Sequence, residues 1–314
     1  MPSFATEVKN ELARLNEESA CCRLAELAAL LRMSAAITIG LHHTFGLNLT
    51  TKNAAVARKA LLLLKKEGGG IRTEITVRRS RQLNKNNDYT VRVMPSPAVN
   101  DLMKKLGFLQ GDRLNMENDM GLLKKNCCRV AYLRGAFQGG GSVNRPEASY
   151  HLELVTGSYE LGKLLHTLLK RMNFPAGFTD RKDVYLVYLK ECDAIIDFLS
   201  MIRAAKAAEA FEVARNLKEV RGQVNRLVNC ETANLQKTVD AAGRQLAAIR
   251  VLARTGCLSR LPQKLQAAAR VRQENPDANL TELAGMLGIS KPGMSYRMRR
   301  LQEEAAALPQ MEQR

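Results

Sequence analysis

A run of three glycines, Gly139 to Gly141, lies in the stretch LRGAFQGGGSVN, between an apolar helical segment and the strand-like SYHLELV. Glycine-rich loops can cradle phosphate because their backbone N–H groups point at the anion. A P-loop, however, needs the order strand, glycines, helix, followed by Lys-Ser or Lys-Thr, and here a helix comes first. The glycines therefore indicate first a helix exit where two backbones approach closely, and a phosphate loop is the sharper alternative.

Seven cysteines are the other residues with reactive side chains. They are Cys21, Cys22, Cys127, Cys128, Cys192, Cys230 and Cys257. None forms a Cys-x-x-Cys pair, and the four histidines, at positions 42, 43, 151 and 166, lack zinc-site spacing. Adjacent cysteines rarely ligate one metal together. We therefore expect reduced structural thiols in a reducing cytoplasm, with no metal and no cofactor.

Three helices are predicted near the carboxyl terminus. Leu265–Glu274 forms the first, which Asn275 and Pro276 end. Thr281 is predicted to N-cap the second, which Gly288 ends, and Ser290 to cap the third. Two short helices joined by a tight glycine turn, the second rich in cations, are typical of a helix-turn-helix.

The last helix of such a unit places its amino-terminal part in the DNA major groove. The residues expected to reach bases or phosphates are Ser290, Lys291, Ser295, Tyr296, Arg297, Arg299 and Arg300. A small helical bundle with a solvated basic face is the alternative.

The first two thirds of the chain repeat with a shift of 106 residues. Cys21-Cys22-Arg23 recurs as Cys127-Cys128-Arg129, and each copy opens an apolar helix that runs into small residues. A strand, a Leu-rich helix, a hairpin and a short closing helix then follow in both halves. The duplication predicts two sheets related by a pseudo-twofold axis, with the first helices of the two halves packed together.

The charge of the chain favours an anionic partner. Its 48 Lys and Arg exceed its 31 Asp and Glu, which gives a formal charge of +17, and both parts of the chain, before and after residue 226, are cationic. Nucleic acid is the commonest partner of such a field. No segment approaches the length of a membrane span, and the amino terminus reads as a first helix and not as a signal peptide, so we expect a cytoplasmic protein.

Paired helices that end in Leu-x-Gly-x-x-x-x-x-Gly and lead into basic, strand-rich halves resemble the LAGLIDADG homing endonuclease fold. In that family an acidic residue in the last turn of each motif helix holds the divalent metal for phosphodiester cleavage. Aligning LRGAFQGGG places Gly140 at that position, and aligning RMSAAITIG places Ile39 there. Neither copy supplies a carboxylate, so we expect a nuclease-like scaffold without metal-dependent cleavage.

The first hairpin alternates between an apolar face, with Ile75 and Val77, and a polar face. Its cationic residues are possible DNA contacts, and they are Arg72, Arg78, Arg79, Arg81, Lys85 and Arg92. A solvated sheet face is an equal alternative. The second hairpin is apolar on both faces, which fits a more buried strand or a protein contact better than DNA.

Two further segments narrow the resemblance. NCETANLQKT at 229–238 and ENPDANLTELAGMLGISKPGMSYRMRRLQEEA at 274–305 are similar to the WhiA family of bacterial DNA-binding regulators, and the match covers nearly the whole chain. It implies a transcription factor acting in cell division, chromosome segregation and, in sporulating lineages, sporulation. It also implies that the helix-turn-helix provides most of the sequence specificity. Asn229, Asn234 and Lys237 match the family signature, and for the asparagines we favour a structural role.

We therefore expect an α+β chain with two domains. The expected parts are a duplicated LAGLIDADG-like domain at 1–205 (halves about 20–108 and 126–205), a helical linker at 206–225, and an all-α DNA-binding domain at 226–314 with its helix-turn-helix at about 280–305.

The leading hypothesis for function is a non-enzymatic, sequence-specific transcriptional regulator that binds promoter DNA in the nucleoid and has no membrane partner. One alternative is an active or vestigial DNA endonuclease that uses acids such as Glu153 or Asp180. The other is a DNA-associated docking platform for a second transcriptional regulator.

Overall fold

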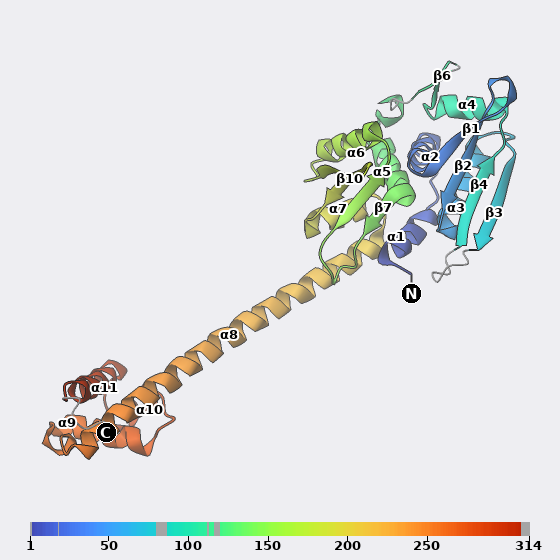
Figure 1. The fold of residues 1–314 in the computed structure, drawn as a ribbon. Coiled ribbons are helices and arrows are strands. Elements are labelled where there is room, and N and C mark those ends of the chain that lie inside the picture. Colours follow the sequence, from blue (N-terminus) through green and yellow to red (C-terminus); the bar gives the residue numbers. More distant parts are fainter. Residues whose placement is uncertain (1, 18, 80–86, 112, 116–119, 309–314) are drawn as a thin grey trace. The chain divides into compact units, whose positions relative to one another are not determined.

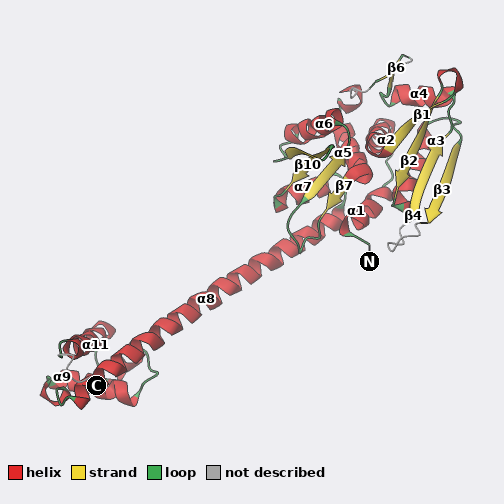
Figure 2. Cartoon of the chain, in the orientation of Figure 1, coloured by secondary structure: helices red, strands yellow, loops and turns green. Residues whose placement is uncertain are grey.

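The computed structural model describes residues 2–17, 19–79, 87–111, 113–115 and 120–308. The chain divides into two compact units, residues 1–218 and residues 219–314. Strands occur only in the first unit within the described residues, as Figure 2 shows. Among the described residues, no helix combines the length and the apolar character that crossing a bilayer requires.

The first half of unit 1 is a four-stranded antiparallel sheet with helices on it (Figure 1). In chain order its elements are α1 (Phe4–Ala13), α2 (Ala20–Ser34), β1 (Ala35–Ile39), β2 (Phe45–Thr51), α3 (Ala54–Glu67), β3 (Thr73–Arg79), β4 (Asn87–Val93) and α4 (Pro97–Lys105). The strand order is β1-β2-β4-β3. A short ladder of β5 (Leu109–Gln110) and β6 (Arg113–Leu114) follows.

The second half of unit 1 repeats this arrangement. Its elements are α5 (Asn126–Gly140), β7 (Gly141–Val143), β8 (Leu152–Thr156), α6 (Tyr159–Arg171), β9 (Gly177–Arg181), β10 (Val184–Leu189) and α7 (Cys192–Met201). The strand order β7-β8-β10-β9 matches that of the first sheet, and α2 and α5 are both 15 residues long. The expected duplication is therefore confirmed.

Helices α2 and α5 pack directly against each other, as the repeat predicts (Figure 1). A Cβ atom at Gly135 would lie 2.1 Å from the carbonyl oxygen of Glu26, and one at Gly139 would lie 2.5 Å from the Cβ atom of Met33. Larger residues at either position would force the helices apart. The small residues at these positions, including Gly139 of the glycine run, therefore permit the two helix backbones to approach closely.

A buried ion-pair network crosses this helix contact, and the sequence pattern did not reveal it. Glu26 is fully buried and accepts hydrogen bonds from Arg134 at 2.9 and 3.1 Å and from Gln138 at 2.8 Å. Lys59 lies 3.6 Å from the same carboxylate. Burial opposes the charge of Arg134, but Glu26 and Glu17 raise the pKa of its guanidinium above the ordinary value.

Helix α8 (Ala205–Arg254) is continuous, and the expected linker at 206–225 lies inside it. Phe211 in its first turns is buried against Phe4 and Tyr150 of unit 1. Its last turns contribute Ile249 and Leu252 to the core of unit 2. The division between the two units falls between Lys218 and Glu219.

In its described residues, unit 2 contains helices and connecting loops and no strand. After α8 come a short 3-10 helix, η3 (Leu258–Arg260), and three α-helices, α9 (Gln263–Glu274), α10 (Leu280–Met286) and α11 (Lys291–Ala306). Its small core collects two or three buried side chains from each α-helix, including Ala268, Leu283 and Met298. Because several helices share so small a core, the orientation of α11 depends on each of these contacts.

Candidate nucleic-acid interface

Helix α11 is held by one end cap and one apolar seam, as expected. The Ser290 hydroxyl accepts a hydrogen bond from the backbone N–H of Gly293 at 3.3 Å, which satisfies one free donor of the first turn. Met294, Met298 and Leu301 recur at helical spacing and are buried. The opposite side of the helix is therefore exposed to solvent along its whole length.

The cap of α10 corrects the sequence interpretation. Asn279, and not Thr281, is the N-cap, because its side-chain oxygen accepts from the backbone N–H groups of Thr281 and Glu282 at 2.9 and 3.1 Å. Glu282 returns the contact by accepting from the Asn279 N–H at 2.8 Å, which completes a capping box. Gly288 has a φ of +60° in the turn that follows α10, a conformation that favours glycine.

Tyr296 and Arg299 lie together on the exposed side of α11. Tyr296 is 56% exposed, and the Arg299 guanidinium lies over its ring at 5.7 Å from the centroid. Lys291 and Ser295 are exposed in the first turns. Side chains of these types can donate to base edges and phosphates or stack on them.

All three arginines among the expected contacts of α11 have partners within the protein, and Arg299 pairs with Glu303 at 3.6 Å. Arg300 pairs with Glu303 at 3.1 Å and with Glu304 at 2.8 Å on its own helix. Arg297 is half-buried and donates to the backbone carbonyl of Lys264 at 3.4 Å. The ion pairs of Arg299 and Arg300 are on the protein surface, where such pairs contribute little stability, so DNA phosphates can compete for these side chains.

Arg272 is a buried residue of unit 2 that sequence reasoning missed. Its guanidinium donates to three backbone carbonyls, those of Asn275, Pro276 and Ala278, at 3.4, 3.3 and 2.6 Å. Burial lowers its pKa from the ordinary value. Arg272 therefore fixes the loop that leads to the capping box. The available signal was its spacing of four residues from buried Ala268, which puts it on the inner face of α9.

The basic hairpin of unit 1 is β3 and β4, at the edge of the first sheet. Arg72, Arg78 and Arg92 are exposed and share one face, whereas Arg79 lies on the other face with Ile75 and Val77. Ile75 and Val77 are 46% and 50% exposed because β3 is an edge strand. Arg81 and Lys85 lie outside the described residues.

Acidic residues stand directly opposite two of these cations. Glu74 is the cross-strand partner of Arg92, and Asp88 is the partner of Arg78. Opposite charges at paired positions attract each other and weaken the field that reaches a distant phosphate. This face is therefore polar and mixed in charge, and less cationic than its arginines alone suggest.

The degenerate motif positions need one correction. Gly140 is the last residue of α5, as expected, and the 106-residue repeat places Ser34, the last residue of α2, at the equivalent position. Ile39 instead ends strand β1. The alignment extended the helix too far because Ala-Ala-Ile-Thr-Ile has already changed to strand alternation. The corrected position still carries no carboxylate.

The backbone around Gly140 also leaves no space for an acidic side chain. A Cβ atom there would lie 2.5 Å from the carbonyl oxygen of Val155 and 2.4 Å from the Met33 side chain. An aspartate or glutamate at this position would therefore require the strand β8 to move. The end of α5 is closed against the sheet and does not open into a metal site.

The two acids proposed for an alternative nuclease are not neighbours on one surface. Glu153 is paired across the sheet with Tyr188, and Asp180 is paired with Tyr185. Tyr185 and Tyr188 are three residues apart in β10 and therefore point to opposite faces. Glu153 also lies 3.2 Å from His151. Among the described residues, no three carboxylate or histidine side chains converge as metal ligands; the one converging group consists of cysteines.

These features define a class: a duplicated LAGLIDADG-like domain followed by a helix-turn-helix domain. Three family models match successive parts of the chain. They are the WhiA N-terminal LAGLIDADG-like domain at 20–109, the WhiA LAGLIDADG-like domain at 129–221 and the WhiA C-terminal HTH domain at 224–305. The crystal structure of full-length WhiA from Thermatoga maritima has a similar fold, with a TM-score of 0.62 and 24% sequence identity. The match covers 98% of this chain and 99% of the Thermatoga maritima chain.

Relatives of known name agree over the full length. A protein of Desulforamulus reducens named "Probable cell division protein WhiA" is 46% identical over 310 residues, which are 98% of this chain and 96% of the relative. One of the same name from Desulfitobacterium hafniense is 46% identical over 316 residues, 99% of this chain and 98% of the relative. The chain belongs to the WhiA family.

Proposed function

We propose that the protein is a transcriptional regulator that reads promoter DNA with α11 and does not cleave it. The exposed Tyr296 and Arg299 pair supports this function most directly, because it sits on a helix fixed by a cap and a buried seam. A rigid helix of this kind can hold side chains at base edges with little loss of conformational freedom.

The names of the relatives support a role in cell division. Both curated relatives are called probable cell division proteins. We infer that the target promoters belong to genes of cell division and chromosome segregation, and of sporulation where the organism sporulates. The protein would then act in the cytoplasm, associated with the nucleoid.

The assignment of a binding role without catalysis rests on the ends of α2 and α5. Ser34 and Gly140 replace the carboxylates that metal-dependent cleavage needs, and the space at Gly140 is filled. Supercoiled plasmid incubated with the protein and Mg²⁺ or Mn²⁺ should stay intact. Nicking by the wild type that a Glu153→Gln variant loses would instead establish an endonuclease.

Selection on a random duplex library tests the reading of sequence. The full-length protein at near-physiological salt should enrich a short motif, and a Tyr296→Ala/Arg299→Ala variant should retain DNA without enriching it. Retention without enrichment by the wild type would contradict the proposal, since it would show that charge alone binds DNA.

A second candidate function is docking of another transcriptional regulator on unit 1. The observation that favours it is the apolar surface at the end of β1, where Ile39 and, two residues later, Leu41 are 73% and 83% exposed. An Ile39→Ser/Leu41→Ser variant would then lose a regulator that co-purifies with the wild type while keeping its DNA affinity. Equal recovery with both proteins would dismiss this surface.

A further inference from the structure

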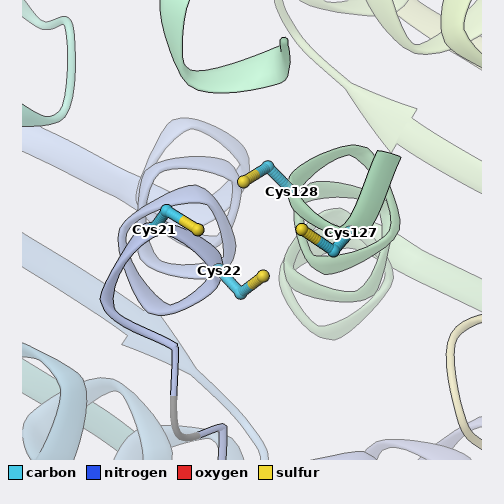
Figure 3. A group of neighbouring side chains, drawn as sticks. All are labelled: Cys21, Cys22, Cys127 and Cys128. Carbon is cyan, nitrogen blue, oxygen red and sulfur yellow. The ribbon is translucent and has the colours of Figure 1, made fainter. Parts of the chain in front are cut away.

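Four cysteines from the two halves of unit 1 meet at one point. Cys21 and Cys22 are in the first turn of α2, and Cys127 and Cys128 are in the first turn of α5. Their four sulfur atoms all lie within 4.8 Å of one another. Figure 3 shows the side chains directed into the space between the two helices.

The fold creates this group from two pairs that are 106 residues apart. The pseudo-twofold arrangement of α2 and α5 brings equivalent residues face to face, so each Cys-Cys pair meets its own copy. Neither pair by itself has the Cys-x-x-Cys spacing of a zinc ligand set, so the sequence pattern does not indicate a metal. Tertiary packing supplies the other two ligands.

The spacing of the sulfurs suits a single tetrahedral ion. Zinc–thiolate bonds of about 2.3 Å in a tetrahedral site place the sulfurs about 3.8 Å apart. A separation within 4.8 Å is close to this value and needs only small side-chain rotations. We propose that Cys21, Cys22, Cys127 and Cys128 form a structural site for one thiophilic divalent cation, Zn²⁺, which joins the two halves of unit 1.

The surroundings suit the net negative charge of four thiolates and one divalent cation. All four cysteines lie in the first turns of α2 and α5, where the positive ends of the helix dipoles favour thiolate. At neither helix does the side chain of the N-cap residue, Ser19 or Lys125, cap a backbone N–H group of the first turn. The Ser19 hydroxyl instead contacts the Cys21 sulfur at 3.1 Å. Such outer contacts orient metal ligands in known sites.

The four cysteines differ in burial, so that a bound ion would be shielded on one side and could enter from solvent on the other. Cys22 and Cys128 are buried, Cys21 is half-buried and Cys127 is exposed. The binding of one ion would release the thiol protons to solvent and leave the sulfurs reduced. Two disulfides between the helices would use the same four sulfurs. Each disulfide would join one sulfur of α2 to one of α5 and leave no thiolate to bind zinc.

The first experiment uses the full-length wild-type chain, reduced and stripped of metal with a chelator. After addition of Zn²⁺ and desalting, we expect one zinc per chain. Alkylation followed by mass spectrometry compares Cys127 with Cys230, because both thiols are exposed but only Cys127 belongs to the group. Zinc should slow alkylation of Cys127 by about 10-fold or more and leave Cys230 unchanged, since a metal-bound thiolate is a poor nucleophile.

A pair of double variants separates binding from folding. Cys21→Ser/Cys127→Ser removes the half-buried and the exposed ligand, and Cys192→Ser/Cys230→Ser removes one half-buried and one exposed cysteine outside the group. Zinc content should fall to near zero in the first variant and stay at one per chain in the second. Zinc should also raise the Tm of the wild type and the control but not of the first variant.

Three results of the zinc experiments would overturn the proposal. They are a wild-type chain that binds no zinc, equal zinc content in the two double variants, and equal protection of Cys127 and Cys230. Disulfides between α2 and α5 in the non-reduced wild-type chain that form again in the presence of Zn²⁺ would also overturn it, since they would show that the group is a redox pair and not a metal site.

Discussion

The exposed side of α11 and the polar face of the first sheet both carry arginines, but acidic residues are distributed differently around them. On the sheet, Glu74 and Asp88 stand directly across from Arg92 and Arg78. On α11 the acids Glu303 and Glu304 lie one turn after Arg299 and Arg300 and pair with them, whereas the first two turns carry cations and no acid. The helix therefore presents its positive charge at one end, whereas the sheet spreads both signs over one surface.

The number of cations on a surface therefore does not by itself define a nucleic-acid interface. The +17 charge of the chain favours polyanions over its whole length. Sequence reading needs side chains held in fixed places, and of these two surfaces α11 is the one with a cap, a buried seam and an exposed aromatic–arginine pair. We assign specificity to α11 and only a sequence-independent contribution to the sheet.

The largest effect is expected on α11. Tyr296→Ala/Arg299→Ala should lower affinity for the selected DNA motif by about 100-fold, because each lost base contact costs about 1 to 3 kcal/mol. Affinity for unrelated DNA should fall much less. Titration of labelled duplexes measures both, with Arg270→Ala on the exposed side of α9 as the control. Equal losses on motif and unrelated DNA would move the specificity away from α11.

The next effect concerns the loop that positions the helix-turn-helix. Arg272→Met keeps the apolar stem but removes the donors to three carbonyls, so we expect the free energy of unfolding of unit 2 to fall by about 2 kcal/mol. Urea unfolding of the full-length chain measures the change. The exposed residue two positions earlier provides the matched variant Arg270→Met, which should unfold at the wild-type midpoint. Identical midpoints for both variants would remove the structural role of Arg272.

A smaller effect is expected on the sheet. Arg78→Ala/Arg92→Ala should weaken binding by about 3-fold to 5-fold on motif and unrelated DNA alike, and should make binding less sensitive to salt, since phosphate contacts carry no sequence information. Affinities at several salt concentrations provide the measurement. A loss confined to the motif would show that the sheet reads bases after all.

The smallest effect comes from the acids beside those arginines. Glu74→Gln/Asp88→Asn should raise affinity for unrelated DNA by about 2-fold at low salt, and the gain should disappear at high salt. If affinity does not change, the paired acids do not weaken the field of this face, and the contrast with α11 loses its electrostatic basis.

Much of the local structure was predictable from patterns of a few residues. The duplication, the order of elements in each half, the seam of α11 and its Ser290 cap follow from periodicity and end signals, which act over one or two helical turns. The errors are also local. Thr281 and Asn279 are both good caps two residues apart, and only the observed hydrogen bonds identify Asn279.

The placement of Ile39 failed for a related reason. The apolar character of RMSAAITIG continues through the change from α2 to β1, so composition alone does not mark the helix end. The repeat itself, applied strictly, would have indicated Ser34. The consequence for function is unchanged, because neither residue provides a metal ligand of the kind that DNA cleavage needs.

The amino-acid sequence by itself determined the two halves, the helix-turn-helix, the basic character and the lack of an acid at the aligned motif positions, because each of these depends on residue type and short spacing. Only the tertiary structure decided which distant residues meet. It buries Glu26 with Arg134, sets acids against the sheet arginines, and gathers two Cys-Cys pairs into one group of four. These contacts join residues up to about one hundred positions apart, and the packing of helices and sheets, rather than any local pattern, brings them together.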